Sequence, residues 1–163
     1  MLFRALLAFI ALPGIFAGLI PTLITLNDQY RGSGSWAGIV LLFCGIVILI
    51  WCVRDFLVTG LGTLAPWDPP KNLVIIGLYR YSRNPMYVGI IMVIGGWALC
   101  VGSLFLAMYG LLLASAFYFR VVFGEELILA RKFGEQWTDY IKKVPRWLPL
   151  SPGSIGKSER RPR

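Results

Sequence analysis

Histidine is absent from this sequence, and its absence excludes catalysis by an imidazole and histidine ligation of a metal. Cysteine is scarce. None of the three cysteines belongs to a Cys-x-x-Cys pair, so the sequence predicts no disulfide and no metal site. Charged residues make up only 15% of the 163 residues, against about 25% in a typical soluble domain. So little charge indicates a chain that is not an ordinary soluble domain.

Apolar residues are abundant: they make up 57% of the chain, and the mean hydropathy is +0.70. They form long blocks, which helices accommodate in lipid because every backbone hydrogen bond stays inside the segment. We expect an all-α integral membrane protein of about four transmembrane helices. The expected segments are 5–26, 36–58, 86–101 and 104–123. A short turn between the last two predicts a tight antiparallel hairpin.

The net charge of +8 lies mainly in residues that flank the hydrophobic segments. This placement indicates topogenic charge and attraction to anionic lipid headgroups, and it argues against nucleic acid as a partner. The loop 59–85 contains Lys71, Arg80 and Arg83, and most of the remaining Lys and Arg residues lie from Arg120 onward. Because positive residues favour the cytoplasmic side, both termini and this loop are expected in the cytoplasm.

Residues 1–150 are expected to form a single transmembrane domain, and residues 151–163 a disordered basic tail. Ahead of that tail we expect a C-terminal amphipathic helix, because apolar residues recur every third or fourth position. The residues of this apolar stripe are Phe133, Trp137, Tyr140, Ile141 and Val144. The helix is expected to lie either on the membrane or on the helix bundle.

Several features on the expected cytoplasmic side could carry chemistry. One is Gly60-Leu61-Gly62, because a Gly-x-Gly lets the backbone approach a ligand closely; glycines in a loop also simply end helices. Another is the run from Gly77 to Tyr87, which gathers tyrosines, arginines and an Asn-Pro pair at a membrane entry. For this run the alternative is an aromatic and cationic belt at the membrane interface.

A third feature is Glu125-Glu126, at the membrane edge of a basic protein. Two adjacent acids are unexpected where positive residues are favoured, and carboxylates bind ammonium groups and hydroxyls well. The alternative is a pair of glutamates that are solvated or bound to cations. A further charged pair, Arg54-Asp55, ends the second hydrophobic segment and either lies at the interface or faces the interior of the bundle.

The order of these motifs resembles a known family: RNPMYVG is followed by EE, then by FGEQWTDY and VPRWLP. Over residues 54–149 the chain is similar to the isoprenylcysteine carboxyl methyltransferase and phosphatidylethanolamine N-methyltransferase superfamily of membrane methyltransferases. GLGTLAPWDPP before GLYRYSRNPMY looks like its short bacterial members. The resemblance implies S-adenosyl-L-methionine as cofactor, a cytoplasmic cofactor-binding loop and the bacterial inner membrane. Membrane lipids and a lipophilic methyl acceptor are the implied partners.

By the same resemblance, a set of residues is implied to bind the cofactor. They are Gly60, Gly62, Gly77, Leu78, Tyr79, Arg83, Asn84, Pro85, Tyr87, Glu125 and Glu126. Asn84 stands where the carboxyl methyltransferases usually have histidine and the phospholipid enzymes more often have asparagine. Arg120 lies near the arginine that family members use on the substrate side.

The implied reaction is in-line methyl transfer from a sulfonium, for which the protein mainly positions the reactants and excludes water. An amine acceptor must lose a proton, with Glu126 or Tyr87 assisting, whereas a carboxylate needs no base and Arg120 would orient it. Catalytic roles are therefore expected for Glu126, Tyr87 and Arg120. The alternatives are an NADPH-dependent membrane reductase of the sterol reductase type and a non-catalytic membrane scaffold. The acceptor and the oligomeric state stay open.

Overall fold

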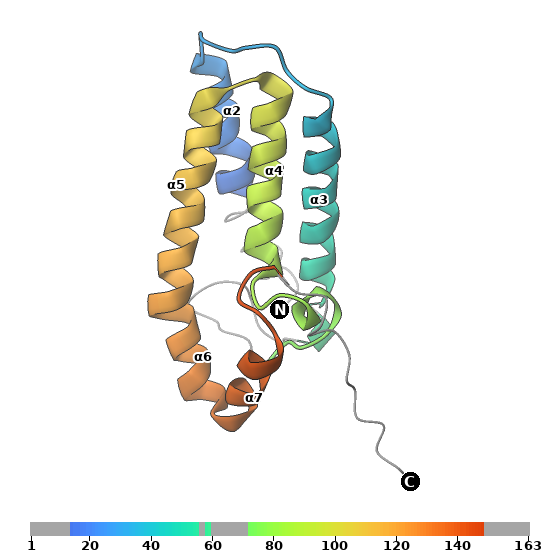
Figure 1. The fold of residues 1–163 in the computed structure, drawn as a ribbon, viewed down its shortest axis with the longest axis vertical. Coiled ribbons are helices and arrows are strands. Elements are labelled where there is room, and N and C mark those ends of the chain that lie inside the picture. Colours follow the sequence, from blue (N-terminus) through green and yellow to red (C-terminus); the bar gives the residue numbers. More distant parts are fainter. Residues whose placement is uncertain (1–13, 56–57, 60–71, 149–163) are drawn as a thin grey trace.

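The computed structural model describes residues 14–55, 58–59 and 72–148, and these residues form helices and loops without a strand (Figure 1). This confirms the all-α class. The elements are η1 (Ile15–Leu19), α2 (Ile20–Asn27), α3 (Ala37–Asp55), η3 (Gly77–Arg80), α4 (Pro85–Val101), α5 (Leu104–Arg120), η4 (Val121–Glu125), α6 (Glu126–Phe133) and α7 (Glu135–Lys143). Among them, η1 and η4 are π-helical turns and η3 is a 3-10 turn.

Helix α4 lies between α3 and α5 and carries the centre of the core (Figure 1). Ile90, Val93 and Ile94 of α4 are buried against apolar residues of α3 and α5. The approach to α3 is close: a Cβ atom at Gly96 would lie 2.4 Å from the backbone nitrogen of Leu42. Only a residue without a side chain permits this contact, and small residues serve the same purpose between helices in membranes.

The turn between α4 and α5 is as tight as the sequence predicts. Gly102 ends α4 with a φ of 66°, and Ser103 is the N-cap of α5, where its hydroxyl accepts a hydrogen bond from the amide of Leu106 at 3.2 Å. The same hydroxyl donates to the buried carboxylate of Asp28, which follows α2. One serine therefore holds the α4–α5 hairpin and the loop after α2 together.

The fourth hydrophobic segment extends further than the sequence predicts. We expected it to end near Phe123, but α5 continues through η4 and α6 to Phe133. Loss of hydropathy does not end a helix here, because Glu, Leu, Ala, Arg and Lys are all good helix formers. The helix ends at Gly134, whose φ is 51°. Phe133 therefore belongs to α6, whereas the rest of the predicted apolar stripe follows the break.

Two helices are long and apolar enough to cross a membrane: Ala37–Asp55, of 19 residues with mean hydropathy 2.5, and Leu104–Phe133, of 30 residues with mean hydropathy 1.7. Only 22% of each hydrophobic window is buried inside the chain, so most of its apolar side chains face outward. The helices Ile15–Asn27 and Pro85–Val101 are apolar but shorter. An apolar surface of this extent needs an apolar surrounding, as a bilayer provides.

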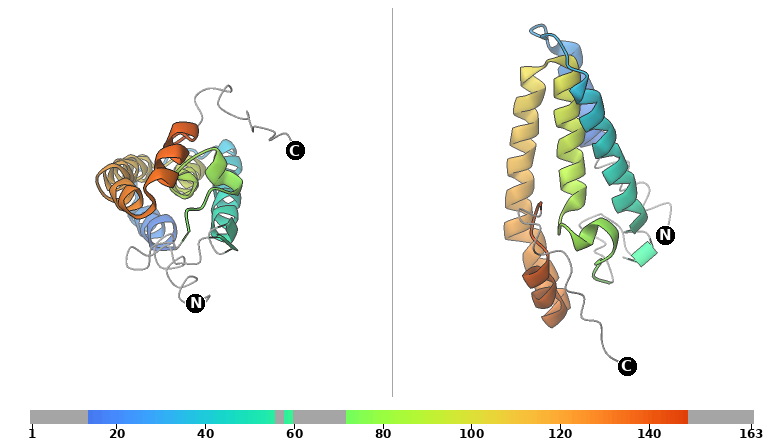
Figure 2. Two further views of the ribbon diagram at one scale, coloured as in Figure 1. Left: turned by 90° about the horizontal axis from the view of Figure 1, so that it is seen from below. Right: turned by 45° about the vertical axis from the view of Figure 1, so that its right-hand side comes forward.

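Helix α7 packs on the chain itself, at the end of the bundle where α6 also lies (Figure 2). Its buried residues Trp137 and Tyr140 form a small cluster with Val144, while Ile141 is exposed. The hydroxyl of Tyr140 donates to the carbonyl of Tyr79 at 2.7 Å, which ties α7 to η3. The sequence leaves open whether this amphipathic helix lies on the membrane or on the helix bundle. In the structure its apolar stripe packs on the bundle. The expected tail 151–163 lies outside the described residues.

Candidate functional site

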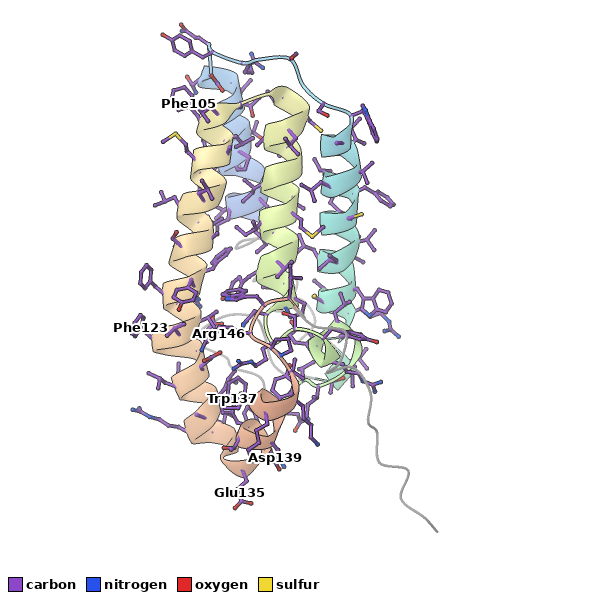
Figure 3. All side chains as sticks on the ribbon, viewed as in Figure 1. Phe105, Phe123, Glu135, Trp137, Asp139 and Arg146 are labelled. Carbon is purple, nitrogen blue, oxygen red and sulfur yellow. The ribbon has the colours of Figure 1, made fainter. Side chains whose placement is uncertain are left out.

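Charged side chains from four parts of the chain meet at the end of the bundle that carries η3 and α7. We call them the arginine–glutamate cluster. Its members are Arg83, Arg120, Glu125, Glu126 and Arg146. Figure 3 labels Arg146 and Trp137 at this end, and Phe105 at the opposite end of the bundle. Among the described residues, the cluster contains every ion pair of the two predicted glutamates, and it divides into two groups.

The first group is built around Glu126, which binds two guanidinium groups at once. Arg83 donates from Nη1 to Oε1 at 2.8 Å. Arg146 donates from Nε to Oε1 and from Nη2 to Oε2, both at 2.8 Å, which is the bidentate geometry of a strong charge-assisted pair. The side chains of Arg83 and Glu126 are only 13% and 16% exposed, so water screens this contact weakly.

Burial and charge act in opposite directions on Arg83. Desolvation lowers the pKa of its guanidinium, and the neighbouring Glu126 carboxylate opposes this effect. For Arg146 the hydrogen bonds to Glu126 raise the pKa. The face of Trp137 lies 5.9 Å from the guanidinium carbon of Arg83, a distance at which a cation and an aromatic ring attract one another. Glu126 and Trp137 therefore hold Arg83 from two sides.

The second group joins Tyr87, Glu125 and Arg120. The hydroxyl of Tyr87 donates to Oε1 of Glu125 at 2.5 Å, and Nε of Arg120 donates to the same oxygen at 2.7 Å and to the hydroxyl at 3.2 Å. The ring of Tyr87 stacks on Phe117, with 4.3 Å between the centroids. The side chain of Arg120 is 45% exposed, so this group opens outward where the Glu126 group is enclosed.

The turn before α4 is fixed by the segment that follows α7. Pro85 is the first residue of α4 and Asn84 is its N-cap, so the helix begins one residue before the expected segment 86–101, with proline in its first turn. The side-chain amide of Asn84 donates to the carbonyl of Arg146 at 3.0 Å, and the amide of Arg83 donates to the carbonyl of Pro145 at 2.9 Å. Asn84 thus contacts backbone and none of the described carboxylates.

The predicted residues Gly77, Leu78 and Tyr79 form η3, which packs against the end of α3. Gly77 has a φ of 53°, and a Cβ atom there would lie 1.8 Å from Oδ2 of Asp55, so the position requires glycine. Tyr79 is buried beside Cys52, and Leu78 packs on the same cluster. Within the described residues, no hydrogen bond joins η3 to the arginine–glutamate cluster directly. The link runs from Tyr79 to α7.

Other sequence predictions have different outcomes. Gly60 and Gly62 lie outside the described residues. Of the Arg54-Asp55 pair, Asp55 is buried at 1% exposure and faces the interior, while Arg54 is mostly exposed and donates to it at 3.1 Å. The structure therefore brings together Arg83, Tyr87, Arg120, Glu125 and Glu126. The remaining described residues of the predicted set lie nearby as scaffold.

Sequence reasoning missed Arg146 and Trp137 as members of the site. Arg146 belongs to the motif VPRWLP, which carried part of the family resemblance, but nothing in that motif pairs it with Glu126. Trp137 has the spacing of an apolar stripe, and a stripe predicts burial without naming an arginine as the partner. Both contacts join residues that are distant in the sequence, so only the folded chain reveals them.

The cluster offers guanidinium and carboxylate groups side by side, next to apolar helices. Such a donor and acceptor set suits a ligand that itself carries both signs of charge. Within the part of the chain that the structure describes, no group of three or more Cys, Asp or Glu residues could hold a metal ion.

Comparison with known proteins gives the family. Residues 34–136 match the family described as phospholipid methyltransferase, which is more than half of the chain. The chain belongs to the phospholipid methyltransferase family. This match spans Arg83, Tyr87, Arg120 and both glutamates. It favours a methyltransferase over a reductase of the sterol reductase type, and with the apolar helices it indicates a membrane protein.

A curated relative supports the assignment. The chain is 34% identical over 80 residues to the protein-S-isoprenylcysteine O-methyltransferase of Schizosaccharomyces pombe (strain 972 / ATCC 24843). That match covers 49% of this chain and 34% of the yeast protein, so the matched region is about a third of the relative's length. No solved structure matches the chain. The family and the relative both indicate a methyltransferase, as the motif order implies.

Proposed function

We propose that this protein transfers a methyl group from S-adenosyl-L-methionine to a lipophilic acceptor at the membrane surface. The family and the yeast relative support methyl transfer. The observation that carries the proposal is the arginine–glutamate cluster, in which Glu125 and Glu126 meet arginines from distant parts of the chain beside the apolar helices. A non-catalytic scaffold has no need for an enclosed Arg83–Glu126 pair beside three further charged side chains at one end of a bundle.

The residues of the cluster fit this cofactor. S-adenosylmethionine carries a carboxylate, an ammonium group, ribose hydroxyls and a sulfonium, so it needs partners of both charge signs. The cluster supplies two carboxylates and three guanidinium groups. Nε of Arg83 is buried and has no hydrogen-bond partner among the described residues, which leaves one donor available. Glu126 and Arg83 are the residues that would hold the cofactor most firmly.

When bound, the cofactor supplies an activated methyl group: a bond forms between the acceptor atom and the methyl carbon while the carbon–sulfur bond breaks and sulfur keeps its electron pair. The chain's task is to align the acceptor and to exclude water. The enclosed Glu126 group serves binding, and the open group of Tyr87, Glu125 and Arg120 faces the acceptor. An amphiphile would reach this open group from the bilayer, along the outward apolar face of α5.

The acceptor decides what the open group does. An amine has to lose a proton, and Glu125 would receive it through the hydroxyl of Tyr87, which lies 2.5 Å away. Glu126 is less suited to this role, because both of its oxygens already accept hydrogen bonds from arginines. A prenyl-type carboxylate needs no base, and the half-exposed guanidinium of Arg120 would orient it.

The proposed placement in the membrane uses all four apolar helical stretches as spans, with the arginine–glutamate cluster and both termini in the cytoplasm. The basic residues near the cluster support this orientation through the preference of Lys and Arg for the cytoplasmic side. For a chain of the short bacterial type, the membrane would be the bacterial inner membrane. The cluster would then lie at the headgroup level, where a water-soluble cofactor and a lipid can meet.

The test is transfer of a labelled methyl group. The detergent-purified full chain is incubated with methyl-tritiated S-adenosylmethionine and either a phospholipid with a primary amine or a prenylated cysteine with a free carboxylate. We expect one of the two acceptor classes to carry label into the organic phase. If that acceptor is the amine, the Glu125→Gln variant should no longer transfer the label. Alkali releases label from a methyl ester and leaves an N-methyl group intact. Absence of transfer to either acceptor by folded protein would contradict the proposal.

A further inference from the structure

The Glu126 group is short of one negative charge. Two guanidinium cations share a single carboxylate there, and the nearby Glu125 is occupied by Arg120 and Tyr87. Arg83 and Glu126 are largely buried, and a buried cation is costly unless an anion accompanies it. The arrangement therefore favours a further anionic acceptor beside Arg83, whose side chain is only 13% exposed, while Arg146 is 32% exposed and can be reached from solvent.

The two arginines also have hydrogen-bond donors to spare. A guanidinium group has five N–H donors. Toward Glu126, Arg83 uses Nη1, and Arg146 uses Nε and Nη2. Nε of Arg83 is buried and without a partner among the described residues. The free donors belong to groups whose planar shape matches a carboxylate, which indicates what kind of anion is missing.

Arg146 is held in this position by its backbone. Its carbonyl accepts hydrogen bonds from the side chains of Asn84 and Ser82, at 3.0 and 3.5 Å, and the preceding carbonyl of Pro145 accepts from the amide of Arg83. The two arginines thus sit on segments that are bonded to each other. Arg146 also lies beyond residue 136, where the family match ends.

We propose that Arg146 and Arg83 together bind the α-carboxylate of the cofactor's methionine end, while Glu126 receives the α-ammonium group beside it. This inference rests on the proposed function and assigns one end of the cofactor to one group of residues. The carboxylate places negative charge beside the two guanidinium groups, and the ammonium group places positive charge beside Glu126. The methionine end is a zwitterion, so it matches the group sign by sign and leaves its net charge unchanged. The carboxylate gives the unused donors of the two arginines, including Nε of Arg83, an acceptor. Arg146 is a binding residue of the site by this account.

The experiment compares two ligands that differ at that end. S-adenosylhomocysteine has the amino and carboxylate groups, and methylthioadenosine lacks both. Each is titrated calorimetrically into the full chain in detergent, for wild type, Arg146→Ala and the control Arg131→Ala, which removes an exposed arginine of α6. We expect Arg146→Ala to lower the affinity for S-adenosylhomocysteine by about tenfold or more, and the affinity for methylthioadenosine by less than about threefold. Arg131→Ala should change neither.

Each other result has a distinct meaning. Equal weakening of both ligands by Arg146→Ala, or equal affinity of wild type for both, overturns the assignment and leaves the proposed function standing. Failure of folded wild type to bind either ligand overturns the proposed function and the assignment together. If Arg146→Ala does not fold, Arg146→Lys keeps the charge and loses the bidentate geometry. It should weaken S-adenosylhomocysteine selectively, by about threefold or more.

Discussion

At the scale of single residues, Tyr87 is the residue at which the proposed acceptor chemistry can be tested separately from cofactor binding. Its hydroxyl contacts Glu125 and Arg120, and its ring stacks on Phe117, so the ring and the hydroxyl have different tasks. The neighbouring Glu126 is bound by other arginines, and Tyr87 makes no hydrogen bond to it within the described residues. Removal of the hydroxyl should therefore affect acceptor activation while leaving the Glu126 group in place.

We expect Tyr87→Phe to lower kcat on an amine acceptor by about a hundredfold, the magnitude typical of a lost proton-transfer group. Affinity for S-adenosylhomocysteine should stay within about threefold of wild type, because the contacts of Glu126 remain. Steady-state kinetics and calorimetry measure the two quantities separately.

The matched control for this change is Tyr109→Phe. Tyr109 also lies in a helix and also donates one hydrogen bond, at 2.9 Å to the carbonyl of Phe16, away from the arginine–glutamate cluster. Its removal should leave kcat unchanged. An unaltered kcat in Tyr87→Phe with an amine acceptor would show that Tyr87 takes no part in proton transfer.

At the scale of elements, the close approach of α3 and α4 sets the position of the site. Tyr87 and the turn that carries Arg83 belong to the start of α4, and η3 rests on the end of α3. Gly96 allows the two helices to touch: a Cβ atom would lie 2.8 Å from the carbonyl oxygen of Gly38 and closer still to Leu42. The adjacent Gly95 has room, with its nearest neighbour at 3.6 Å.

These neighbouring glycines give a direct comparison. We expect Gly96→Ala to force α3 and α4 apart and to lower the free energy of unfolding by about 1–3 kcal/mol, as overpacking does. Gly95→Ala should be neutral or slightly stabilising, because alanine favours helix over glycine by about 1 kcal/mol. Thermal unfolding in one detergent measures both variants. Equal stability of the two variants would contradict the packing described for α4.

The sequence predicts the parts of this fold that depend on local chemistry. Asn84-Pro85 starts α4, Gly102-Ser103 turns the hairpin, and the stripe on α7 is buried at Trp137 and Tyr140. The continuation of the fourth helix to Phe133 is not predicted, because hydropathy falls near Phe123 and indicates an end there. The helix continues through a π-helical turn, since the residues that follow have high helix propensity.

Part of the site can likewise be predicted from local sequence features, and part depends on tertiary contacts. Glutamates at a positive membrane edge and the Arg-Asn-Pro-x-Tyr element are conspicuous in the sequence, and the structure brings Glu125, Glu126, Arg83 and Tyr87 together. Arg146 could not be predicted, because its contacts with Glu126 and Asn84 span 20 and 62 residues of sequence. No periodic pattern reports such tertiary contacts.

At the scale of the whole molecule, the described helices form a bundle whose outer surface is mostly apolar, and the arginine–glutamate cluster lies at one end of it. The two long helices bury only 22% of their hydrophobic windows inside the chain. The arginine–glutamate cluster lies at the end where α6 continues α5 and α7 turns back after Gly134 (Figures 1 and 2). This arrangement is the one that the proposed function requires, because a water-soluble cofactor and a lipid-embedded acceptor would meet where the apolar helices border the charged cluster.

The most direct test of this account is calorimetric titration of the detergent-purified full chain with S-adenosylhomocysteine, in wild type, Glu126→Gln and Glu135→Gln. Glu126 contacts Arg83 and Arg146, whereas Glu135 is an exposed residue of α7. The account predicts saturable binding to wild type and an affinity that is about tenfold or more lower in Glu126→Gln. Binding to Glu135→Gln should be unchanged. Folded wild type that does not bind, or binding that survives Glu126→Gln intact, would contradict it.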